Sequence, residues 1–169
     1  ESGNHHKRLI LGMVGLPARG KSYISRKLCR FLAWIGYKSK VFNIGNYRRN
    51  KIGVDIDFNS FFDHSNESSK KARDYCALVA LQDLCDNINN NAISIAIFDG
   101  TNTTFDRRKL VAQTLREKLT VKYSLIWIES ICDINDIIMR NIVETKLNSP
   151  DYIDWQDKEA ARKDFEQRI

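Results

Sequence analysis

Short runs of apolar residues alternate along the chain with longer segments in which apolar residues recur every three or four positions. The short runs are typical of buried strands, and they lie at 9–14, 40–43, 93–98 and 123–128. The longer segments predict helices at about 21–35, 66–89, 104–119, 133–146 and 155–169. Strands that alternate with helices favour a parallel sheet with right-handed crossovers. The predicted fold class is therefore α/β, a three-layer α/β/α sandwich.

Residues at the segment ends support this division. Gly36 is expected to end the first helix, because glycine tolerates the left-handed backbone found there. Ser65 or Asn66 and Thr103 or Thr104 are candidate N-caps of the next two helices. The face of the first helix expected to meet the sheet consists of Ile24, Leu28, Phe31, Leu32 and Ile35. A loop is expected at 50–65, pinned to the body by Phe58, Phe61 and Phe62.

The segment Gly15–Ser22, G-L-P-A-R-G-K-S, fits the phosphate-loop pattern G-x-x-x-x-G-K-[ST] and lies between the first strand and the first helix. The two glycines allow backbone N–H groups to turn inward around an anion, and the helix dipole favours negative charge at the same point. Lys21 can then reach the terminal phosphates, and the Ser22 hydroxyl can bind Mg²⁺. The alternative is a glycine turn in an unrelated α/β protein. All eight positions match the pattern, with a predicted strand before the loop and a predicted helix after it. A nucleoside triphosphate site is therefore favoured over an unrelated glycine turn.

Asp99 follows a buried apolar strand, where a carboxylate can hold Mg²⁺ through water or accept the proton of an attacking hydroxyl. The alternative role is a helix cap. Thr101 and Asn102 can line the same cleft, although turn and cap roles also fit them. Cys132 follows another strand end but has no evident base beside it, so it is at most a positioning group.

Arginines supply the candidate sites for a second phosphate. Arg48 and Arg49 follow the second strand and suit bidentate phosphate recognition, although a solvated surface pair is the alternative. Arg73 and the pair Arg107–Arg108 are weaker signals, because charged residues on helices are usually exposed to solvent.

The composition narrows the function classes. The 169 residues are 43% hydrophobic with two prolines, which indicates one globular domain. The formal charge of +6 fits either a nucleic-acid partner or a pocket for ATP and a phosphorylated substrate. Of these two explanations of the charge the phosphate-binding pocket is preferred, so no nucleic-acid partner is expected. No apolar run has membrane-spanning length, so no membrane partner is expected either. The four cysteines lack the spacing of a metal site. Cys29, Cys76 and Cys85 lie within apolar helical patterns and are expected to be buried. Cysteines of this kind fit a reducing compartment, so a cytoplasmic location is expected.

A set of narrower motifs occurs in one order along the chain: G-L-P-A-R-G-K-S-Y-I-S, W-I-G, K-V-F-N-I-G-N-Y-R-R, F-D-G-T-N-T-T, I-E-S-I-C-D, N-I-V-E-T-K and S-P-D-Y. Together they resemble the kinase domain of 6-phosphofructo-2-kinase/fructose-2,6-bisphosphatase. The resemblance implies a nucleotide-kinase-like phosphate-loop fold over 9–169, truncated at its C-terminal end, with 1–8 as a flexible end or a cloning remnant.

The resemblance also implies roles for individual residues. The implied ATP site comprises Gly15, Leu16, Pro17, Ala18, Arg19, Gly20, Lys21, Ser22, Tyr23, Asn141, Ile142, Val143, Glu144, Thr145 and Lys146. The implied fructose 6-phosphate contacts are Arg48, Arg73, Thr101, Arg107, Lys146 and Arg168. The implied catalytic residues are Lys21, Asp99 and Cys132, and the implied Mg²⁺ ligands are Ser22 and Asp99.

The chain departs from the family pattern at identifiable positions. Gly100 replaces a common alanine and is expected to relax the loop beside Asp99, and Asn46 replaces a common glutamate near Arg48. A further substrate tyrosine of the family is absent. No histidine lies in the Arg-His-Gly context of the phosphatase half, so any phosphatase domain is expected outside this chain.

The expected activity is Mg²⁺-dependent transfer of the ATP γ-phosphoryl group to the 2-hydroxyl of fructose 6-phosphate. The alternatives are another phosphate-loop kinase, acting on a polynucleotide or a small metabolite, and an ATP-binding module without turnover. A homodimer and fusion to a phosphatase domain are both compatible with the resemblance.

Overall fold

The computed structural model describes residues 7–53, 61, 66–153 and 156–166, and contains one parallel four-stranded sheet among them. The strands run in the order β2-β3-β1-β4 and are β1 (Arg8–Val14), β2 (Ser39–Asn43), β3 (Ile95–Asp99) and β4 (Tyr123–Glu129). The helices are α1 (Lys21–Trp34), α2 (Ile44–Ile52), α4 (Glu67–Asn89), α5 (Phe105–Lys118), α6 (Asn135–Asn141), the π-helix η1 (Ile142–Lys146) and α7 (Lys158–Glu166). All four predicted strands are confirmed. Arg8, expected to belong to a flexible end, begins β1.

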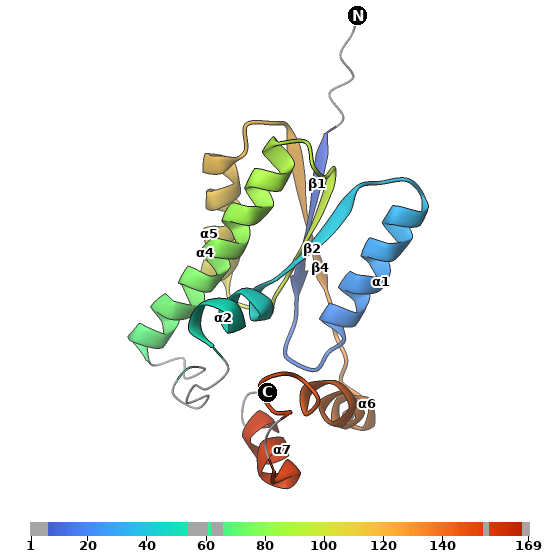
Figure 1. Cartoon of the computed structure of the whole chain (residues 1–169), viewed down its shortest axis with the longest axis vertical. Coiled ribbons are helices and arrows are strands. Elements are labelled where there is room, and N and C mark those ends of the chain that lie inside the picture. The colour runs from blue at the N-terminus through green and yellow to red at the C-terminus, as the bar shows by residue number, and fades with distance from the viewer. Residues whose placement is uncertain (1–6, 54–60, 62–65, 154–155, 167–169) are drawn as a thin grey trace, which may run out of the picture.

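Helices cover both faces of the sheet (Figure 1). Helix α1 packs on one face through Leu32, beside Met13 and Ile97 of the central strands. Helices α4 and α5 pack on the other face, where Leu81 and Leu115 join a larger buried cluster. The three-layer α/β/α sandwich is therefore confirmed. None of the helices in the described part of the chain is both long and apolar enough to span a bilayer.

The predicted sheet-facing side of α1 is wrong in part. Leu32 is buried and Leu28 packs against the same cluster, but Ile24, Phe31 and Ile35 are exposed. The buried stripe of α1 instead consists of Lys21, Ser25 and Leu32. The physical reason is that α1 begins at the phosphate loop with Lys21 directed inward, and this fixes the rotation of the helix about its axis.

The carboxyl end of β2 continues into a helix that the apolar pattern did not predict. In α2, Asn43 acts as N-cap and its side chain accepts a hydrogen bond from the Asn46 N–H at 3.1 Å. Arg48 therefore lies on a helix, rather than on the extended segment that its place after a strand suggested. Asn66 and Thr104 are confirmed as N-caps.

The helices after β4 form a separate cluster at the end of the sheet where the strands finish (Figure 1). The predicted helix 133–146 is divided into α6 and η1, and the described part of the last helix is α7. Ile142, Tyr152 and Phe165 are buried together here, and Ala18 of the phosphate loop packs among them. Phe61 is buried, as expected, whereas Phe58 and Phe62 lie outside the described residues.

Candidate active site

The phosphate loop connects β1 to α1 as the sequence predicted. Gly15 and Gly20 adopt φ angles of 141° and 84°, which glycine tolerates better than other residues. A Cβ on Gly15 would also lie 2.5 Å from the Ser130 backbone oxygen. Lys21 is 7% exposed, and its Nζ donates to the Leu16 backbone oxygen at 2.5 Å. Its ammonium group therefore lies over the loop, where terminal phosphates would be held.

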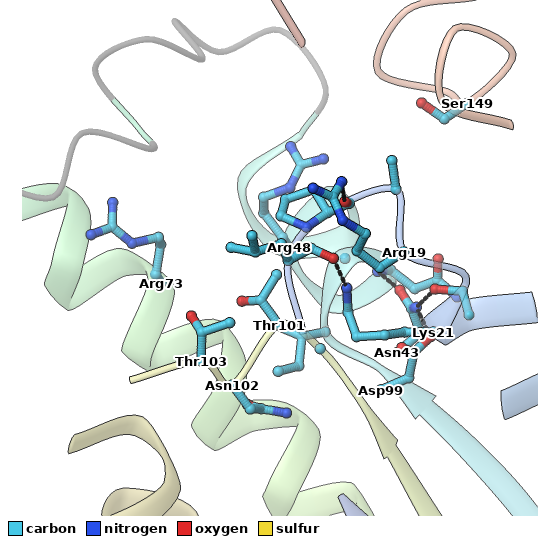
Figure 2. A pocket seen from close by; sticks show the side chains of 18 of the residues that line it. Arg19, Lys21, Asn43, Arg48, Arg73, Asp99, Thr101, Asn102, Thr103 and Ser149 are labelled. Atoms are coloured by element: carbon cyan, nitrogen blue, oxygen red, sulfur yellow. Dashed lines mark hydrogen bonds between the residues drawn. The ribbon is translucent and has the colours of Figure 1, made fainter. Parts of the chain in front are cut away.

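Asp99 ends the central strand β3 beside the phosphate loop and is 2% exposed. Asn43 is its partner in the register of the parallel strands. The Asn43 amide donates to Asp99 Oδ2 at 2.5 Å and to Ser22 Oγ at 3.4 Å, so one side chain joins the carboxylate to the hydroxyl (Figure 2). Asn43 was not predicted as a site residue. Its position as the last residue of β2 was the available signal, because parallel strands finish at one edge.

The residues at this point fit a magnesium ion. Ser22 and Asp99 offer a hydroxyl and a carboxylate oxygen, and both lie within hydrogen-bonding distance of the same amide. Mg²⁺ in kinases is held by one or two such oxygens together with substrate phosphates and water. The predicted ligand pair is thus brought together by the fold.

The loop after Asp99 is held against the phosphate loop. The Gly15 N–H donates to the Thr101 backbone oxygen at 2.9 Å, and the buried Asn102 amide donates to the Met13 backbone oxygen at 2.8 Å. Asn102 has a φ of 44°, a left-handed conformation that asparagine tolerates. Thr101 is exposed and lines the cleft. Asn102 therefore holds this loop in place, and Thr101 projects from the loop into the cleft.

Three of the predicted arginines line the same cleft. Arg48 is buried and donates to Asp151 at 2.5 Å. Arg107 donates to Asp74 at 2.6 Å and to the Arg73 backbone oxygen at 3.4 Å, and so joins α5 to α4. Burial lowers the pKa of Arg107 and Asp74 opposes this shift, so the guanidinium remains charged. Figure 2 shows Arg73 on α4, across the opening from Lys21 and Asp99.

The segment N-I-V-E-T-K contributes unevenly to the cleft. Asn141 donates to the Ala18 backbone oxygen at 2.9 Å, and Asn141, Glu144 and Thr145 line the cleft. Ile142 is buried in the cluster with Ala18, and Val143 is exposed. The side chain of Lys146 and the whole of Arg168 lie outside the described residues.

One cleft of about 2150 Å³ joins the phosphate loop, Asp99 and the arginines. Single-ligand pockets usually measure about 300–1,000 Å³, so this space can take two substrates side by side. Cys132 also lines it and is half-buried. Cys76 and Cys85 are buried as expected, whereas Cys29 is only half-buried.

The comparisons with known proteins agree with this geometry. The family model of 6-phosphofructo-2-kinase matches residues 1–169. The chain is 44% identical over 160 residues to 6-phosphofructo-2-kinase/fructose-2,6-bisphosphatase 3 of Bos taurus, which covers 95% of this chain and 34% of that protein. It is 48% identical over 157 residues to 6-phosphofructo-2-kinase/fructose-2,6-bisphosphatase 1 of Mus musculus. That match covers 93% of this chain and 32% of the mouse protein. The chain thus spans about a third of the length of these relatives.

Solved structures with low sequence identity share the fold. A putative kinase from Chloroflexus aurantiacus has a TM-score of 0.59 at 14% identity, with 98% of this chain and 97% of that chain covered. The APS kinase of Mycobacterium tuberculosis, in complex with AMPPNP and APS, also has a TM-score of 0.59, at 13% identity. That match covers 85% of this chain and 74% of the APS kinase chain. These likenesses confirm the phosphate-loop kinase fold.

Proposed function

Because this chain belongs to the 6-phosphofructo-2-kinase family, we propose that it transfers the γ-phosphoryl group of ATP to the 2-hydroxyl of fructose 6-phosphate. The product is fructose 2,6-bisphosphate. The observation that carries the proposal is the single cleft that joins the phosphate loop, Asp99 and the arginine side chains. A phosphoryl donor and a phosphorylated acceptor both require such fixed positive charge.

In this proposal one set of residues binds ATP and another set binds the sugar phosphate. Backbone N–H groups of the phosphate loop and Lys21 bind the terminal phosphates of ATP. Arg48, Arg73 and Arg107 bind the sugar phosphate, which holds the 2-hydroxyl in line with the γ-phosphorus. Magnesium, held by Ser22 and Asp99 together with the phosphates, would neutralise charge on the transferring group.

Asp99 has a further role in this proposal. Its carboxylate orients the 2-hydroxyl and would also hold the magnesium ion, and the Asn43 amide holds the carboxylate through Oδ2. Thr101 binds the sugar from the adjacent loop. Cys132 contributes to positioning only, since phosphoryl transfer needs no nucleophilic side chain. Lys146 and Arg168 complete the proposed set by family resemblance. A phosphatase domain and a homodimer in the full-length protein are proposals on the same basis. A cytoplasmic location is a proposal that rests on the absence of a disulfide pattern among the four cysteines.

The test is ADP release measured with Mg·ATP, in the presence and absence of fructose 6-phosphate. Sugar-dependent release is expected from the wild type. Lys21→Met is expected to reduce it by at least about a hundredfold while the fold is kept, because a fixed positive charge that meets the transferring group is lost.

Lys27→Met is the matched control, because Lys27 lies on the same helix but is exposed. It should retain wild-type turnover. Two outcomes contradict the proposal: full activity of Lys21→Met, and ATP binding by the wild type without any sugar-dependent release. The second outcome would favour a nucleotide-binding module.

A further inference from the structure

Asp151 bridges two arginines at the edge of the cleft. Its Oδ2 accepts hydrogen bonds from Arg48 at 2.5 Å and from Arg49 at 3.3 Å. Its side chain is 12% exposed, so both interactions lie largely away from water. Charge-assisted hydrogen bonds of this kind are strong and directional. The carboxylate therefore helps to fix where the two guanidinium groups point, together with the Gly53 backbone oxygen, to which Arg48 donates at 3.4 Å.

The segment that carries Asp151 is itself anchored. The next residue, Tyr152, is 1% exposed, and its hydroxyl donates to Asp164 of α7 at 2.5 Å. The Tyr152 backbone N–H donates to the Ser149 backbone oxygen at 2.9 Å, which closes the turn around Asp151. A carboxylate on such a rigid turn can orient a neighbouring side chain, rather than following its movement.

The trio keeps an excess of positive charge. Two guanidinium groups share one carboxylate, and Arg49 also donates to the neutral Asn46 amide oxygen at 2.6 Å. Asp151 Oδ1 is buried and accepts no hydrogen bond within the described part of the chain. Two guanidinium groups and one carboxylate give these three side chains a positive sum, which suits an anionic ligand at this edge of the cleft.

We propose that Asp151 is a positioning residue for the phosphorylated acceptor, one that orients Arg48 toward the phosphate group of the sugar. The inference rests on the proposed function, because it concerns how that acceptor is bound. Asp151 does not touch the reacting atoms. Its loss is therefore expected to weaken acceptor binding and to leave ATP binding unchanged.

The experiment compares Asp151→Asn with the wild type by steady-state kinetics in both substrates. Asp151→Asn has almost the same shape but carries no charge. Its KM for fructose 6-phosphate is expected to rise on the order of tenfold, with a smaller change in kcat and an unchanged KM for ATP, because a misdirected guanidinium weakens binding of one substrate only. Asp151→Glu restores the charge and should give an intermediate KM.

Asp136→Asn is the matched control, because it removes a carboxylate from the same group of helices, one that is exposed and does not line the cleft. It should leave the KM for the sugar phosphate unchanged. An unchanged or lower KM in Asp151→Asn would overturn the inference, and a lower one would mean that Asp151 competes with the phosphate. If Asp151→Asn does not fold, a wild-type KM in Asp151→Glu overturns it instead. A wild type without sugar-dependent turnover would overturn the proposed function rather than this role alone.

Discussion

The end of the Ile44 side chain occupies the space beside Gly100, the residue that follows Asp99. A Cβ at position 100 would lie 2.5 Å from Ile44 Cδ1 and 3.3 Å from Cγ1. Gly100→Ala is therefore expected to lower the free energy of unfolding by no more than about 1 kcal/mol, because only the end of the Ile44 side chain must move out of its packed position. Urea denaturation measures this change. The glycine thus accommodates its neighbour, which is a more specific role than the loosening expected from the sequence.

Ile44→Val is the matching change, because it removes Cδ1, the nearer of the two atoms. The double variant Gly100→Ala/Ile44→Val is expected to be more stable than the sum of the two single effects predicts. If the two single changes in the free energy of unfolding simply add in the double variant, the contact between position 100 and Ile44 is not the cause of the destabilisation.

Single residues of the site differed in how well the sequence predicted them. Lys21 and Asp99 could be predicted because a motif and a strand end fix their places. The strand end at Asn43 was a signal for its place in the site, but its bond to Asp99 spans 56 residues, and the bond between Arg48 and Asp151 spans 103. Such contacts follow from the sheet register and from the packing of the last helices, which local patterns do not determine.

At the scale of elements, Asp83 ties α4 to α2 and β2. Its Oδ2 accepts hydrogen bonds from the Tyr47 hydroxyl at 2.5 Å and from Lys40 Nζ at 3.2 Å. Tyr47→Phe is expected to lower the free energy of unfolding by about 1 kcal/mol, because one hydrogen bond to a partly exposed carboxylate is lost. Urea denaturation at neutral pH measures this loss.

The contribution of Tyr47 should depend on pH. Burial and the Asp83 carboxylate raise the pKa of Tyr47 well above its ordinary value. Its stabilising contribution is therefore complete below about pH 10, the pKa of an unfolded tyrosine, and declines at higher pH, where the unfolded chain ionises first. The difference between wild type and Tyr47→Phe should be the same at pH 8 and pH 9, and should shrink from about pH 10 to pH 11. The exposed Tyr37 supplies the control, and an equal decline with Tyr37→Phe would contradict the assignment.

The strands were predictable as elements, whereas α2 was not. Each strand is a short apolar run between polar residues, a pattern that burial in a parallel sheet imposes. Helix α2 has the sequence I-G-N-Y-R-R-N-K-I, which contains a glycine and no apolar stripe. It forms because Asn43 caps it and Asp83 holds Tyr47. A local cap and one tertiary contact therefore determine it, and the apolar pattern displays neither.

At the scale of the whole molecule, the cluster of α6, η1 and α7 is attached to the sheet through the phosphate loop. Ala18 packs in the cluster beside Ile142, and the Asn141 amide donates to the Ala18 backbone oxygen at 2.9 Å. Ser130, after β4, donates to the Arg19 backbone oxygen at 2.5 Å. Ordering of the loop by a nucleotide should therefore also order the cluster.

Hydrogen–deuterium exchange tests this coupling. In the wild type, Mg·ATP is expected to slow amide exchange in both α1 and α7, although only α1 adjoins the phosphates directly. Asn141→Ala removes the bond to Ala18, so nucleotide at saturating concentration should still protect α1 but should protect α7 several-fold less. Asn148→Ala is the control, because its amide contacts only backbone oxygens of its own segment, those of Val143 and Glu144, among the described residues. Equal protection of α7 in Asn141→Ala and the wild type would mean that packing around Ala18 alone transmits the effect.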